Sequence, residues 1–241
     1  MVRGLFITGT DTGIGKTVVT AALLRRFRLN GVAPGAMKPI ETGVARETES
    51  TSDAARLRVA AGMPEPLDEM APYRFSDPLA PYDAAKRCST TIELTRIIQA
   101  FHRLTERYRP VLVEGAGGLL VPIGSDWSMR ELILALDLPV VVIGPARLGG
   151  VNHALLTLEA LAQARCRVAG LVLTVPCPVQ TAAELAQQQS TVELLRTQAG
   201  VPVFGPVPYQ PEMESRWNER IEELAKSEPI RELADRLIGA Q

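Results

Sequence analysis

A glycine-rich stretch near the start of the chain has the residue types of a loop that binds phosphate groups. This stretch, GTDTGIGKT at residues 9–17, follows a short apolar run at 5–8 and precedes a helical pattern that begins at Lys16 and Thr17. The first backbone N–H groups of a helix have no partner within the helix, and the helix dipole favours an anion beside them. Lys16 would reach the β- and γ-phosphates, and the Thr17 hydroxyl would bind Mg²⁺. We therefore expect the loop to bind a nucleoside triphosphate with Mg²⁺.

Two other interpretations of this stretch fit the residues less well. An ordinary glycine-rich turn with an exposed lysine has a similar composition, but the order of apolar run, Gly-Lys-Thr and helix favours the nucleotide loop. A dinucleotide-binding fingerprint that begins at Gly13 would need a third glycine at position 18, which is Val18. The spacing is nevertheless unusual, because Thr10 stands where the common pattern has its first glycine.

Three charged residues could complete a site for phosphoryl transfer. Glu114 ends the apolar run at 111–115, and parallel sheets bind ligands beyond the carboxyl ends of their strands. A surface glutamate in a turn is the alternative. Asp53, taken alone, is typical of a helix N-cap. Lys38 ends the run at 35–39 and is either a charge at a sheet edge or a second phosphate contact; a shaped loop after it favours the second.

Short apolar runs alternate along the chain with longer segments of helical period. The expected strands are 5–8, 35–39, 111–115, 139–144, 168–175 and 202–208. The expected helices are 16–29, 52–61, 91–108, 128–136, 151–164, 181–199 and one near 229–238. This alternation predicts an α/β fold of three layers, a mostly parallel sheet with helices on both faces. We expect one domain over residues 1–241, with a polar mobile loop at 43–51 and irregular, proline-rich structure at 63–89.

The composition argues against several classes of partner and site. The 241 residues carry a net charge of −1, so we expect neither general binding to nucleic acid nor binding to an anionic membrane. The three cysteines lack C-x-x-C spacing, which argues against a zinc site or a disulfide framework. No apolar stretch approaches the length of a membrane span, and we expect a cytoplasmic protein.

Five motifs in order give the chain a resemblance to a known family. The motifs GTDTGIGKT, KPIETG, SD, EGAGG and LGGVNHALLT are similar to those of dethiobiotin synthetases, the ATP-dependent carboxylases of biotin biosynthesis. The resemblance extends to about residue 212, and the stretched phosphate loop is the form this family has. It implies a P-loop fold with a seven-stranded, mostly parallel sheet, and a homodimer.

The resemblance also implies a reaction. One amine of 7,8-diaminononanoate adds CO₂ to form a carbamate, and the γ-phosphoryl group of ATP moves to that carbamate. The second amine attacks the resulting carbamic-phosphoric anhydride and closes the ureido ring. The products are dethiobiotin, ADP and phosphate.

The resemblance implies roles for individual residues. The implied Mg²⁺ ligands are Thr17, Asp53 and Glu114, and the implied catalytic residues are Thr12, Lys16 and Lys38. The implied nucleotide-binding residues are Thr12, Gly13, Ile14, Gly15, Lys16, Thr17, Val18, Thr174, Pro208 and Glu212. The implied substrate-binding residues are Thr42, Gly117, Gly118, Leu148, Gly149, Gly150, Val151 and Asn152, of which the last five come from the other subunit at the interface. The two glycines at 149 and 150 are expected to leave bare amide N–H groups before a helix.

The chain departs from the family at the position that contacts adenine. The family commonly has an asparagine there, and this chain has Thr174. The single hydroxyl of threonine replaces the separate donor and acceptor groups of an asparagine amide, so we expect weaker discrimination among bases. Ala80 also replaces a common serine.

Two alternatives to this enzyme share its fold. Partitioning-type ATPases are switches that carry an extra lysine early in the phosphate loop, where this chain has Asp11. Amidoligases of cobalamin synthesis usually carry a glutaminase domain, for which 241 residues leave no room.

Overall fold

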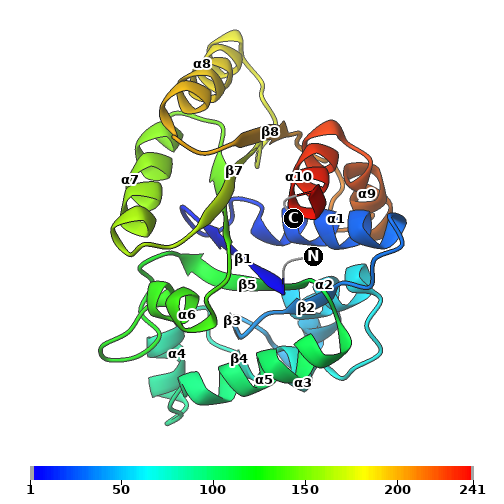
Figure 1. Ribbon diagram of the computed structural model, residues 1–241, viewed down its shortest axis with the longest axis vertical. Helices are drawn as coiled ribbons and strands as arrows, with labels where there is room; N and C mark the ends of the chain where they lie inside the picture. Colours follow the sequence, from blue (N-terminus) through cyan, green and yellow to red (C-terminus); the bar gives the residue numbers. More distant parts are fainter. Residues whose placement is uncertain (1–2, 240–241) are drawn as a thin grey trace.

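A computed structural model of the chain describes residues 3–239, and its main feature is a six-stranded parallel sheet (Figure 1). The strand order is β2-β5-β1-β6-β7-β8. The strands are β1 (Gly4–Gly9), β2 (Gly35–Met37), β5 (Val111–Gly118), β6 (Val140–Pro145), β7 (Val168–Thr174) and β8 (Val203–Val207). All neighbouring strands are parallel, so their carboxyl ends lie at one edge of the sheet. The α/β class predicted from the sequence is confirmed.

The helices cover both faces of this sheet, with α6 and α7 on one side and α1, α9 and α10 on the other (Figure 1). The longer helices are α1 (Lys16–Leu29), α2 (Asp53–Ala61), α5 (Leu94–Arg107), α6 (Met129–Leu136), α7 (Gly150–Gln163), α8 (Ala182–Gln198), α9 (Trp217–Ala225) and α10 (Glu228–Gly239). Helix α1 has the predicted bounds. It packs against β1 and β5 and is itself covered by α9 and α10.

A second, two-stranded parallel sheet lies beside the main one, and here the sequence-based prediction is wrong. It consists of β3 (Ile40–Thr42) and β4 (Tyr73–Phe75), between which lies a 3-10 helix (Arg46–Thr51) where a loop was predicted. The segment 63–89 was expected to be irregular, yet it holds β4 and the helices α3 (Leu67–Met70) and α4 (Pro81–Arg87). It also buries Met70 and Phe75. These elements are three to seven residues long, too short for a periodic pattern to show. The main sheet has six strands among the described residues, where the family resemblance implied seven.

One cluster of buried hydrophobic side chains runs from Leu5 in β1 to Leu237 in α10. Strands β1 and β6 are buried along their whole length, which explains their uninterrupted apolar sequence. None of the helices in residues 3–239 combines the length and the apolar character that a membrane crossing requires.

Helix α6 begins with a capping box that predicts acid-sensitive stability. Partial burial disfavours the Glu131 carboxylate, but hydrogen bonds from the side chain and backbone of Ser128 and from Arg130 outweigh that effect and lower the pKa of Glu131 from 4.5 to about 2. A lowered pKa in the folded state adds stability above about pH 4.5 that is lost as the pH falls towards 2. Glu131→Gln should therefore unfold at lower urea concentration than the wild type at pH 7, and the difference should shrink at pH 3. An equal difference at both pH values would contradict this.

Candidate functional site

The phosphate loop joins β1 to α1 and leaves the start of the helix open to a ligand. Gly15 precedes the helix in the left-handed region, at φ 93°, which a residue with a side chain rarely adopts. Lys16 is buried, and its Nζ donates a hydrogen bond of 2.6 Å to the backbone carbonyl of Asp11. Burial and the nearby charge of Lys38 lower the pKa of Lys16 to about 8. The Lys16 side chain thus folds back over the loop, and its ammonium group lies near the N-terminus of α1.

Lys38, Glu114 and Thr17 meet beside this loop. The Nζ of Lys38 lies 2.6 Å from Oε1 of Glu114 and 3.0 Å from Oδ2 of Asp53. The Thr17 hydroxyl donates a hydrogen bond of 2.8 Å to the same Oε1 of Glu114. Three segments far apart in the sequence therefore converge on the N-terminus of α1.

The sheet and α2 produce this convergence. Lys38 directly follows β2, and β2 pairs with β5 so that Met37 lies beside Val113, the residue before Glu114. Ser52 is the N-cap of α2, because its hydroxyl accepts a hydrogen bond from the backbone of Ala55. The N-cap interpretation of Asp53 is therefore wrong. As the first residue of the helix, Asp53 has its carboxylate free to meet Lys38.

Glu41 holds α2 in place and was missed by the sequence analysis. Its buried carboxylate accepts hydrogen bonds from the backbone N–H groups of Asp53, at 2.5 Å, and Ala54, at 3.2 Å. Burial, followed by the charge of Asp53, raises the pKa of Glu41. A carboxylate at a helix N-terminus is favoured by the dipole, and here it comes from a neighbouring strand rather than from the helix itself. Only the tertiary structure shows this contact.

The charges of the cluster stabilise one another. Burial disfavours the ammonium form of Lys38, but Glu114 and Asp53 together outweigh burial and raise the pKa of Lys38. Burial also disfavours the charged form of Asp53, and the ammonium of Lys38 reverses this and lowers the pKa of Asp53. The cluster therefore favours a charged Lys38 beside a charged Asp53 at neutral pH.

The residues predicted to bind Mg²⁺ suit that ion. Thr17, Asp53 and Glu114 offer the hard oxygen donors that Mg²⁺ prefers. Oε2 of Glu114 is buried and has no hydrogen-bond partner among the described residues, which costs free energy unless a ligand occupies it. Among the side chains that the structure describes, which exclude those of residues 46–48, no cluster of three or more acidic, histidine or cysteine residues could hold a metal. Mg²⁺ typically takes one or two carboxylates together with substrate phosphates, so the sparse set fits it.

A cavity of 330 Å³ lies over the phosphate loop, and we call it the phosphate-loop cavity. The predicted site residues that line it are Thr12, Gly13, Gly15, Lys16, Thr17, Val18, Lys38, Thr42, Asp53 and Gly117. The lining residues that the sequence did not indicate are Ile40, Glu41, Arg56, Ala116, Met213, Glu214 and Trp217. Three of these, Met213, Glu214 and Trp217, come from the C-terminal part of the chain, and they reach the cavity because α9 packs on α1.

A second cavity of 270 Å³ shares Gly13, Gly15 and Val18 with the first and extends towards the ends of β7 and β8. Thr174 and Pro208 line it, as predicted for nucleotide-binding residues. The Thr174 hydroxyl donates a hydrogen bond of 2.6 Å to the backbone carbonyl of Ile14. This threonine therefore ties β7 to the phosphate loop.

Several predicted site residues lie outside both cavities, including Glu114, which contacts Thr17 and Lys38 in the wall of the first. The backbone carbonyl of Ile14 is held by Thr174, and Gly118 pairs with Gly9 at the end of β1. Glu212 lines neither cavity, and its carboxylate pairs with Arg216 and Arg220 instead. Its role in nucleotide binding stays a prediction.

The segment from Leu148 to Asn152 comprises the end of the turn after β6 and the first residues of α7, and it does not line the phosphate-loop cavity. Leu148 is 77% exposed. The amide of Gly150 was expected to be bare, but it donates a hydrogen bond of 2.9 Å to the carbonyl of Arg147. That expectation is wrong for Gly150, because the chain turns back tightly as the helix begins. A side chain at this position would lie 2.2 Å from the carbonyl oxygen of Pro145, so the turn requires glycine.

Comparison with known proteins shows a family and a fold. A family model described as an AAA domain matches residues 3–216. An ATP-dependent dethiobiotin synthetase of Anaeromyxobacter dehalogenans (strain 2CP-C) is 49% identical over 172 residues, which cover 71% of this chain and 76% of that protein. Another, of Thermodesulfovibrio yellowstonii, is 38% identical over 222 residues, covering 88% and 91%.

A solved structure with a similar fold is the MinD cell division protein of Aquifex aeolicus. The TM-score is 0.59 with 14% identity, and the match covers 99% of this chain and 97% of that one. Identity this low shows a shared fold alone. The two curated relatives, by contrast, are 49% and 38% identical to this chain over the aligned residues.

Proposed function

Since this chain belongs to the family of ATP-dependent dethiobiotin synthetases, we propose that the phosphate-loop cavity is its active site. The enzyme carboxylates 7,8-diaminononanoate with CO₂ and closes the ureido ring at the expense of ATP, giving dethiobiotin, ADP and phosphate. The observation that carries the assignment is the position of Lys38, which joins Glu114 and Asp53 beside the N-terminus of α1.

In this proposal the residues around the loop act on the phosphoryl group that moves from ATP to the carbamate. The backbone at the start of α1 and Lys16 bind the phosphates of the nucleotide. Lys38 contacts the carbamate oxygen and the γ-phosphate, and its positive charge stabilises the negative charge that builds up between them. Thr12 and Thr42, which line the same cavity, contact the diamine and the carbamate, and the backbone of Gly117 and Gly118 lies beside the substrate.

We propose Thr17, Asp53 and Glu114 as the protein ligands of Mg²⁺. The ion would neutralise charge on the phosphates as phosphoryl transfer proceeds. The buried, unpaired Oε2 of Glu114 supports this role, because a cation would satisfy it. A cytoplasmic location and the absence of nucleic-acid and membrane partners stay predictions of the sequence.

We further propose a homodimer in which the turn from Leu148 to Asn152 of one subunit binds the substrate carboxylate at the site of the other. The exposure of Leu148 and the distance in the sheet between β6 and β2 support a contribution to the partner's site rather than to its own. Two variants that each lose activity can test this, Asn152→Ala and Lys38→Ala. In a mixed dimer one of the two sites carries neither change.

Unfolding and refolding the two variants together should therefore restore about one quarter of wild-type activity, since half of the dimers are mixed and each has one intact site. Refolding each variant alone is the control. No recovery, with mixed dimers demonstrated by mass, would contradict a shared site.

Base selection should be weak. The Thr174 proton is donated to the carbonyl of Ile14, so Thr174 has no proton left for a base. We expect ATP, CTP and GTP to support turnover with kcat/KM values within about tenfold of one another, because no strong base contact is lost on exchange. Thr174→Asn should raise the preference for ATP. A wild-type preference for ATP above a hundredfold would refute weak selection.

The experiment that tests the function uses purified protein with the diamine, bicarbonate, Mg²⁺ and ATP. Mass spectrometry should detect the cyclic urea in amounts equal to the phosphate released. Phosphate release that occurs without the cyclic urea, and without dependence on the diamine, would indicate a partitioning-type ATPase instead.

A further inference from the structure

Arg56 is a cation in the wall of the phosphate-loop cavity for which neither the sequence motifs nor the family resemblance provides a role. It lies three residues after Asp53 on α2, so both side chains are on one face of the helix. Its side chain is 15% exposed and lines the cavity together with Lys16 and Lys38. Arg56 is thus partly buried at the place where we propose that the phosphates bind.

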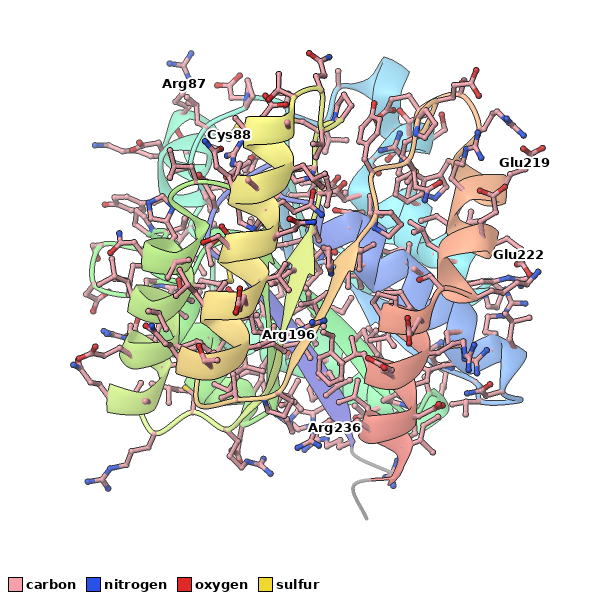
Figure 2. All side chains as sticks on the ribbon, turned by 90° about the horizontal axis from the view of Figure 1, so that it is seen from above. Arg87, Cys88, Arg196, Glu219, Glu222 and Arg236 are labelled. Atoms are coloured by element: carbon pink, nitrogen blue, oxygen red, sulfur yellow. The ribbon has the colours of Figure 1, made fainter. Side chains whose placement is uncertain are left out.

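An aromatic ring fixes the orientation of this guanidinium. The Cζ of Arg56 lies 4.3 Å from the ring centroid of Trp217, the first residue of α9. Glu219 and Glu222 lie further along the same helix (Figure 2), where their carboxylates pair with Arg216 and Arg25 rather than with Arg56. A guanidinium stacked on a ring keeps its N–H groups at the edge, where they can reach another partner.

Most of those N–H groups have no protein partner. Among the described residues, the only acceptor recorded for the Arg56 side chain is the carboxylate of Glu214, which bonds to Nη2. The Glu214 side chain is 82% exposed, so water can satisfy it if the arginine changes partner. Holding a guanidinium against a ring in a cavity restricts its rotamers, and that cost is recovered where an anion that matches its forked N–H groups binds, such as a phosphate.

The charges of the cavity also leave a role for Arg56. Lys38 is engaged by Glu114 and Asp53, and Lys16 by the carbonyl of Asp11. A triphosphate brings several negative charges into a cavity whose wall already includes the carboxylates of Glu41 and Asp53. Arginine binds phosphate through two parallel N–H···O hydrogen bonds, which suits it to this position.

We propose that Arg56 is a phosphate-binding residue, with Trp217 as the platform that holds its guanidinium and Glu214 as the partner that phosphate displaces. The proposal rests on the assignment of the phosphate-loop cavity as the nucleotide site. It adds a contact from α2 and α9, outside the loop between β1 and α1.

The test compares the affinities of the wild type and Arg56→Ala for ATP, ADP, AMP and adenosine by calorimetry without metal. We expect the Kd of ATP to rise about tenfold to a hundredfold, as for the loss of a hydrogen bond to a charged group, with the Kd of adenosine unchanged. The step in the series at which the loss disappears identifies the phosphate. Arg56→Lys should recover part of the affinity, because lysine keeps the positive charge but cannot donate two parallel hydrogen bonds to one phosphate.

Arg58→Ala, two residues further along α2, is the matched control, because Arg58 does not line the cavity. Equal loss of affinity for all four ligands would show that Arg56 only supports the wall, and it would overturn the proposal. If Arg56→Ala does not fold, Arg56→Lys must show the same dependence on phosphate or the proposal fails. Failure of the wild type to bind ATP would instead overturn the nucleotide site itself.

Discussion

Replacement of Lys38 by alanine should lower turnover by about 100- to 1,000-fold, the range found when one group that stabilises transition-state charge is removed. The affinity for ATP should change much less, since Lys16 and the start of α1 remain. The reason is the place of the Lys38 ammonium, within 3.0 Å of two carboxylates and at the edge of the cavity that we propose for the transferring group. Single-turnover kinetics and calorimetric titration with ATP measure the two effects separately.

The same variant has a structural consequence that needs its own control. Without Lys38 the buried Glu114 carboxylate loses its counter-charge, and leaving one partner of a buried pair costs about 3–5 kcal/mol of stability. Mg²⁺ with ATP should recover part of that loss by supplying positive charge. Lys86→Ala removes an exposed lysine and should affect neither property. Near-normal turnover in a folded Lys38→Ala protein would contradict the role of Lys38 in catalysis.

Glu114→Gln should reduce kcat/KM by at least about 100-fold, because loss of a metal ligand removes several kcal/mol of charge stabilisation. The substitution preserves the shape of the side chain but replaces its carboxylate by an uncharged amide. In the wild type, Oε1 contacts Thr17 and Lys38, and Oε2 has no partner among the described residues. The Mg²⁺ concentration needed for half-maximal rate should rise. A titration of the rate with Mg²⁺ at saturating ATP measures this shift.

The matched control for this variant is Glu65→Gln. Glu65 is also buried, but it pairs with Tyr108 and Arg107 rather than with Thr17 and Lys38, the partners of Glu114 in the wall of the phosphate-loop cavity. Both variants remove a buried negative charge, and only Glu114→Gln should alter the Mg²⁺ dependence. An unchanged Mg²⁺ requirement in Glu114→Gln would exclude Glu114 as a ligand.

The sequence predicts the centre of the site well because its residues lie in, or directly beside, strands and helices with clear local patterns. Lys16 and Thr17 begin a helix after a buried strand. Lys38 directly follows β2, and Glu114 lies within β5, one position beyond the partner of the last residue of β2. Parallel strands place such positions together, so their convergence follows from the fold class. Local sequence patterns therefore predict the phosphate loop, the two lysines and Glu114 as site residues.

The wall of the cavity could not be predicted in this way. Arg56 and Trp217 are 161 positions apart, and only the packing of the C-terminal helices on α1 brings them together. Glu41 lies on a three-residue strand, too short to show a period, and its contact with α2 depends on the turn of the chain between them. Such contacts are tertiary and leave no local signal.

The most direct measurement is the fate of the oxygen atoms of CO₂ when the substrate is labelled with oxygen-18 and the reaction is stopped before exchange with water. In the proposed site a carbamate oxygen attacks the γ-phosphorus, the bond to ADP breaks, and attack by the second amine then expels that oxygen with the phosphate. One labelled oxygen should therefore appear in each phosphate released, and one should remain in the ureido carbonyl. Formation of the cyclic urea with unlabelled phosphate would contradict phosphoryl transfer to a carbamate among Lys16, Lys38 and Glu114.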